Sequence, residues 1–157
     1  KDTNLYFLNI YRLLTEDRLP FCPEEYFDRL LAVLHQYDNK NQGLSCDNII
    51  CVIEKLKAQT LKALSGCTEK EYNWVLKTVG GTMNRLCQSS GSQYDQDLAF
   101  SGPPVFTKLV TFLKTNKEEE SPKEYVFLRT DFIRQENRII AEVSKLNDFL
   151  ENRYGIA

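Results

Sequence analysis

SPKEYVFLRTDFIRQENRIIAEVSKLNDFLENRYG, residues 121–155, carries a start signal and a stop signal for one long helix. Ser121 is a good N-cap, Pro122 suits the first helical position, and Glu124 follows within the first turn. Gly155 provides the stop, since glycine commonly follows the last residue of a helix. At 1.5 Å per residue, this helix would span roughly 45 Å.

The apolar residues of this stretch approximate a heptad repeat, which Gln135 and Glu136 interrupt. A helix of this length is expected to lie across several others or to project past them. The same seam predicts a homodimer formed through the last helix. Its members are Tyr125, Leu128, Phe132, Ile139, Val143, Leu146 and Leu150.

Five segments upstream of this helix also have helical periodicity, and Pro, Gly or polar connectors separate them. No segment alternates apolar and polar residues for long enough to predict a strand. The expected fold class is therefore all-α, a bundle or short solenoid of five to six helices ending in a long C-terminal helix. We expect one domain over 1–157, and because the first residue is Lys1, we expect it to be excised from a longer protein. The five segments are approximately residues 4–17, 20–37, 45–64, 69–88 and 104–115.

Two local patterns refine the segment at 69–88. Thr68 and Glu71 have the spacing of a capping box, in which each side chain satisfies the other residue's unpaired backbone N–H. Gly80 and Gly81 lie inside the predicted helix, where two glycines cost about 2 kcal/mol of helix propensity. We expect a kink there or a close approach of another helix.

The segment at 4–17 is apolar around most of its circumference. Such a helix is either central in its own fold or covered by a partner. The pattern favours a core helix, and the alternative is an interface helix that packs on the rest of a parent protein. The residues concerned are Leu5, Phe7, Leu8, Ile10, Tyr11, Leu13 and Leu14.

Composition places the chain among soluble globular proteins. Hydrophobic residues make up 42% and charged residues 27% of the 157 positions, which is more apolar than a disordered chain. The net charge of −2 argues against a domain that mainly neutralises phosphates. The five cysteines are an odd number and form no Cys-x-x-Cys pair, so we expect unpaired thiols and an intracellular location, nuclear or cytoplasmic. No apolar run is long enough to span a bilayer, so no membrane association is expected.

The side chains that carry enzymatic or metal chemistry are sparse. His35 is the single histidine, and no nearby pattern marks a cysteine nucleophile. Structural zinc normally shows closely spaced ligand pairs, which are missing here. We therefore expect no catalytic residues, no cofactor and no metal, and a protein that is not an enzyme.

The connector from Asp38 to Gly43 resembles the opening of an EF-hand calcium loop. Gly43 falls at the sixth loop position and Asp38 at the first. However, Lys40 and Ile49 stand at the third and twelfth positions, where oxygen ligands are needed. We expect no calcium binding, and chance resemblance of a polar loop is the preferred interpretation.

The remaining apolar and aromatic residues favour a non-catalytic protein–protein interaction domain, of the scaffold or adaptor kind. Aromatic side chains are common anchors of interfaces. The long loop at 89–104 holds Tyr94, Leu98 and Phe100, which are the first candidates for partner binding. Phe7 and Tyr11 in the first segment are the second. Equally, the loop residues can fold back to seal the bundle.

The alternative function is nucleic-acid binding through a lysine-bearing face of the third and fourth helices. Its lysines are interleaved with glutamates, as on an ordinary soluble surface, so nucleic acid is the less favoured partner. The residues are Lys55, Lys57, Lys62, Lys70 and Lys77.

Overall fold

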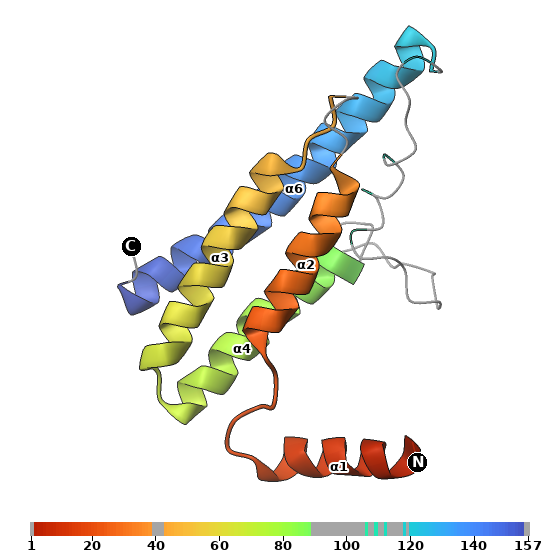
Figure 1. Cartoon of the computed structure of the whole chain (residues 1–157). Helices are drawn as coiled ribbons and strands as arrows, with labels where there is room; N and C mark the ends of the chain where they lie inside the picture. The colour runs from red at the N-terminus through yellow and green to blue at the C-terminus, as the bar shows by residue number, and fades with distance from the viewer. Residues whose placement is uncertain are drawn as a thin grey trace.

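The computed structural model describes residues 2–38, 43–88, 106, 109, 112, 118 and 120–155, and every element in this part is a helix. The predicted all-α fold, a helical bundle ending in a long helix, is confirmed (Figure 1). Residues 104–115, predicted to form a further helix, lie mostly outside the described residues. The helices are α1 (Asp2–Thr15), α2 (Pro23–Tyr37), α3 (Asp47–Gly66), α4 (Glu69–Gln88) and α6 (Pro122–Tyr154).

Helix α3 is the centre of the bundle, because α2, α4 and α6 all pack against it. The chain runs up α2, down α3 and up α4, so these sequential neighbours are antiparallel (Figure 1). Ile49, Ile53 and Leu56 are fully buried along α3, at the spacing of one helical face. A single apolar face on a central helix therefore organises the described bundle.

Helix α6 uses its C-terminal half to close the core against α3 and α4. Its N-terminal end projects past the other described helices, as the sequence predicted (Figure 1). Most residues of the heptad-like seam are buried within the chain itself, and the homodimer predicted through this helix stays a prediction. The seam residues buried in this way are Phe132, Ile139, Val143, Leu146 and Leu150.

Polar contacts tie α6 to its neighbours at its C-terminal end. Glu151 accepts hydrogen bonds from Lys55 at 2.7 Å and from Gln59 at 2.6 Å. The Arg153 guanidinium stacks over the Trp74 ring of α4, 4.2 Å from its centroid. These contacts fix the end of α6 over both α3 and α4.

Both predicted helix starts have the expected caps. The Ser121 and Glu124 side chains form a capping box with each other's backbone N–H, and Pro122 occupies the first helical position. The Thr68 N–H donates to Glu71 Oε2 at 3.2 Å, and the Glu71 N–H donates to Thr68 Oγ1 at 3.5 Å. Gly155 ends α6 at φ +60°, in the left-handed region that favours glycine.

The cap at Ser121 predicts a modest and pH-dependent stability effect. Ser121→Ala should lower the free energy of unfolding by about 1 kcal/mol. Hydrogen bonds from Ser121 lower the pKa of Glu124 below 4.5. Because this pKa is lower in the folded state, the carboxylate contributes stability above pH 4.5 that is lost as the pH falls. Urea unfolding of the wild-type chain and of Ser121→Ala at pH 7 and at pH 3 measures the size of this effect and its pH dependence. An equal loss of unfolding free energy at the two pH values would contradict the role of Glu124.

All five cysteines are unpaired, as the sequence predicted. Cys46 and Cys87 are buried, and burial raises the pKa of each thiol to about 12. A thiol with such a pKa is protonated at neutral pH and is a poor nucleophile. These two side chains act as small core residues.

Candidate functional site

Helix α1 is apolar but lies outside the bundle core. Figure 1 shows it set apart below α2 and α4. Its large apolar residues are all exposed, from 43% at Leu13 to 79% at Leu14, so the favoured interpretation of a core helix is wrong. The alternative, an interface helix that packs on another part of a parent protein, stays a prediction. The exposed residues are Leu5, Tyr6, Phe7, Leu8, Ile10, Tyr11, Leu13 and Leu14.

The exposed area of α1 exceeds what a monomer normally leaves open. If each aromatic side chain has about 150–250 Å² of surface, and Leu and Ile are taken at the lower end of that range, the eight residues expose on the order of 900 Å² at the fractions observed. The largest apolar patch of a typical monomer is about 300–600 Å². A stable interface buries about 800 Å² on each partner. The apolar area exposed around this helix is therefore on the scale of an interface.

One face of α1 has the spacing of a docking helix. Phe7, Ile10, Tyr11 and Leu14 stand at positions i, i+3, i+4 and i+7, which is how a helix anchors in a groove. The Phe7 and Tyr11 rings stack with centroids 6.5 Å apart. The two residues of the first segment predicted to bind a partner therefore lie side by side in the middle of this face.

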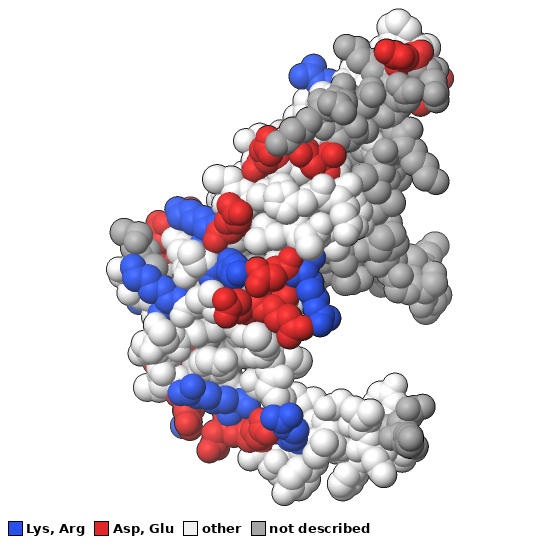
Figure 2. Space-filling model, in the orientation of Figure 1, with Lys and Arg blue, Asp and Glu red and all other residues white. Residues whose placement is uncertain are grey.

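The middle of α1 carries no charge. Residues 2–15 contain only Asp2 and Arg12 as charged residues, and Arg12 pairs with Glu16 at 2.7 Å. Figure 2 shows no charged group along the middle of this arm, and acidic and basic groups gathered where it joins the bundle. An uncharged middle between Asp2 and Arg12 resembles the apolar core and charged rim of an interface.

Asn73 of α4 holds the segment that leaves α1. Its Nδ2 donates to the backbone oxygen of Asp17 at 2.7 Å, and its Oδ1 accepts from the backbone N–H of Leu19 at 2.8 Å. The Arg18 guanidinium between them stacks over the Tyr72 ring at 5.0 Å. The segment that follows α1 is therefore fixed to α4.

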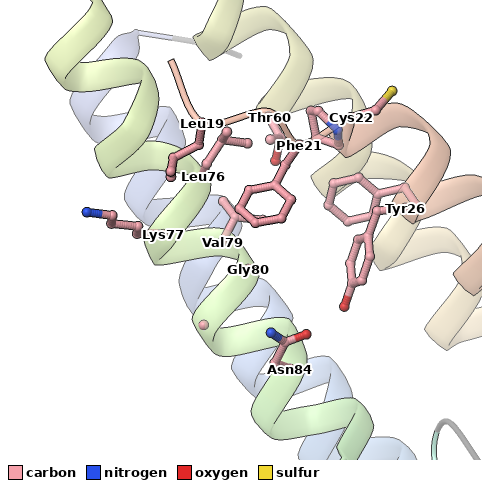
Figure 3. A pocket seen from close by; sticks show the side chains of 13 residues that line it. Leu19, Phe21, Cys22, Tyr26, Thr60, Leu76, Lys77, Val79, Gly80 and Asn84 are labelled. Carbon is pink, nitrogen blue, oxygen red and sulfur yellow. The ribbon is translucent and has the colours of Figure 1, made fainter. Parts of the chain in front are cut away.

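A recess of about 400 Å³ opens between the 19–23 segment, the start of α2 and one side of α4; we call it the α2/α4 hollow (Figure 3). Its walls are mainly apolar, and the polar side chains among them include Lys77 and Asn84. Gly80 and Gly81 also line it, and a Cβ added at either would meet nothing within 4 Å. The apolar walls include Leu19, Phe21, Tyr26, Phe27, Leu76 and Val79.

Two hydroxyl groups line the α2/α4 hollow. Thr60 is fully buried, and its Oγ1 has no hydrogen-bond partner among the described residues, which is costly for a buried polar group. The Tyr26 hydroxyl lies 4.0 Å from Cys87 Sγ. Burial first, and then the Cys87 contact, raise the pKa of Tyr26, so its phenol is neutral at physiological pH.

The sequence did not single out the α2/α4 hollow. The pair Gly80-Gly81 was the available signal, but it predicted a kink or a close helix approach. Helix α4 continues through both glycines, and a Cβ added at either meets no neighbour within 4 Å, so the predicted close helix approach is not observed. The glycines instead leave the recess open.

The other predicted site residues have different outcomes. Tyr94, Leu98 and Phe100 lie outside the described residues, so their role as a partner site stays a prediction. On the lysine-bearing face, Lys55 pairs with Glu151 at 2.7 Å and Lys57 with Asp28 at 2.5 Å. These pairs reduce the charge available to a phosphate backbone.

The connector that resembles an EF-hand loop has structural contacts at both of its described ends. Asp38 Oδ1 accepts a hydrogen bond from the Cys46 N–H at 3.0 Å. Gly43 adopts φ +71°, and a Cβ there would lie 3.0 Å from the Tyr125 hydroxyl. Ile49 is fully buried in α3. Across the described residues, no three His, Cys, Asp or Glu side chains converge as metal ligands.

Comparisons of the chain with protein-family models, with curated proteins and with solved structures returned no match. Among the described helices, none combines the length and apolar character needed to cross a membrane.

Proposed function

We propose that this chain is a non-catalytic protein–protein interaction domain, of the scaffold or adaptor kind, in which α1 is the docking element. The observation that carries the proposal is the exposure of all eight large apolar residues of α1. Burying them against a partner would gain hydrophobic free energy that the isolated chain forgoes. The spacing of Phe7, Ile10, Tyr11 and Leu14 favours a partner that offers an apolar groove.

The chemistry of α1 favours a protein over a membrane surface as its partner. Helices that lie in a membrane interface usually have a polar face rich in Lys and Arg. Residues 2–15 of this chain contain a single basic side chain, Arg12. A protein groove needs no such charge, so it suits this helix better.

The test is affinity capture of a partner from cell lysate, with the wild-type chain and three variants as bait. Phe7→Ser/Tyr11→Ser/Leu14→Ser should weaken partner retention about 100-fold or more, because several anchors of at least about 2 kcal/mol each are removed. The matched control, Val126→Ser/Phe127→Ser/Ile133→Ser, alters three apolar residues of α6 that are also exposed, and it should retain the partner. Circular dichroism of each variant checks that the bundle is folded.

The third variant tests the loop that the sequence favoured. Tyr94→Ala/Leu98→Ala/Phe100→Ala should retain the partner if α1 is the docking element. Loss of the partner in this variant, with retention in the α1 variant, would move the site to the loop. Retention in all three variants would contradict a role for α1.

A further inference from the structure

We infer that the partner of α1 is a second copy of this chain, and that α1 of each copy docks across the α2/α4 hollow of the other. The inference rests on the proposed function, because it takes α1 to be a docking helix. It adds the identity of the partner and the site that receives the helix.

The exposed apolar surface of α1 has the composition of a homodimer interface. Its exposed area, on the order of 900 Å² around the whole helix, is of the same order as the roughly 800 Å² that a stable dimer buries on each subunit. Homodimer interfaces are more apolar than transient ones, and charged residues are depleted at their centre. Between Asp2 and Arg12, residues 3–11 carry no charge.

The same chain carries an apolar recess that suits α1 as a docking site. The α2/α4 hollow is walled by Phe21, Tyr26, Leu76 and Val79, and Gly80 leaves its floor without a side chain (Figure 3). An apolar side chain entering it would cover Phe21, which is 58% exposed.

Helix α1 and the α2/α4 hollow lie close together on the chain. Leu19 lines the hollow, and its backbone N–H is held by Asn73 only a few residues after the end of α1. A two-fold axis near residues 16–21 would therefore place each α1 over the other copy's hollow. One symmetry operation then covers both apolar surfaces of both copies, which is how a two-fold interface closes.

The path of the chain disfavours docking of α1 on its own hollow. Only Glu16 separates the end of α1 from Asp17, whose backbone oxygen is bound by Asn73. The Glu16 N–H is itself bonded to the Arg12 oxygen, so the helix turn continues up to the held segment. No slack is left for α1 to turn back.

The test is the molar mass in solution, measured by light scattering after size exclusion and by sedimentation velocity. The wild-type chain should have the mass of two copies at about 100 μM. Gly80→Leu should fill the hollow and weaken the dimer at least about 30-fold, and Phe7→Ser/Tyr11→Ser/Leu14→Ser should do the same. Gly66→Leu is the matched control, because a Cβ there also meets nothing within 4 Å, and it should remain dimeric.

Fold integrity is separable from dimerisation in these variants. Replacing a glycine inside a helix raises helix propensity, so monomeric Gly80→Leu should melt no lower than the monomeric α1 variant. If Gly80→Leu fails to fold, the α1 variant and Gly81→Leu carry the test.

Three results would overturn the inference. They are a monomeric wild-type chain at about 100 μM, a dimer that survives both the Gly80 and the α1 changes, and a dimer lost in Gly66→Leu as readily as in Gly80→Leu. If the wild-type chain is monomeric, and the α1 variant still loses a captured protein of another kind, the inference fails while the proposed function stands. If the α1 variant loses nothing, both fail.

Discussion

Phe27→Ala should lower the free energy of unfolding by about 3–5 kcal/mol, which is the usual cost of truncating a fully buried aromatic residue. Phe27 is 0% exposed in α2, in the core that α2 shares with α3. Truncation removes the ring's transfer free energy and leaves a cavity. Because domains of this size are stable by only about 5–15 kcal/mol, the loss is a large part of the total.

The matched control for Phe27→Ala is Phe127→Ala, which makes the same chemical change at a residue that is 62% exposed in α6. It should change the free energy of unfolding by less than about 0.5 kcal/mol. Urea denaturation followed by circular dichroism measures both variants. A similar loss in the two would mean that α2 does not pack on α3 as described.

Val143→Asp should destabilise the chain by about 4 kcal/mol or more at pH 7, because it places a carboxylate where nothing solvates it. Val143 is 0% exposed in α6, whose buried face lies mainly against α3. An Asp held there has a pKa above its unfolded value of about 3.9. Above about pH 4 the unfolded state then binds fewer protons than the folded state, so the loss of unfolding free energy grows as the pH rises and is smallest below about pH 4.

The control for Val143→Asp is Val126→Asp on the same helix, at a residue that is 61% exposed. A carboxylate there stays hydrated, and its effect should be within about 0.5 kcal/mol at any pH. Thermal melts at pH 7 and pH 4 compare the two variants. A Val143→Asp deficit that did not change with pH would show that water reaches the α3–α6 interface.

These two substitutions also bear on the function of α1. They probe the core, and no residue of α1 belongs to that core. If Phe27 and Val143 carry the stability, α1 can present its apolar face without loss to the fold. A binding defect in an α1 variant then reports on docking and not on unfolding.

The helix boundaries were largely predictable because their signals are local. The Ser121–Glu124 and Thr68–Glu71 caps and the glycine stop at Gly155 each act within a few residues of sequence. The core face of α3 was predictable for the same reason, since Ile49, Ile53 and Leu56 follow helical spacing. Periodicity and capping therefore determined that the chain is all-α, where most of its helices begin and end, and which residues are available for burial.

Whether an apolar face is buried depends on its neighbours, which local sequence does not specify. The apolar residues of α1 and α3 look alike in sequence, yet α3 is surrounded by three helices and α1 is held away from the bundle by the contacts of Asn73 with Asp17 and Leu19. The α2/α4 hollow arises in the same way, because its walls come from separate segments whose distance only the folded chain sets. The sequence by itself thus determined the helices and their apolar faces. Tertiary structure alone decided which of those faces is left exposed to meet a partner, because burial is a property of the contacts between segments and not of any one segment.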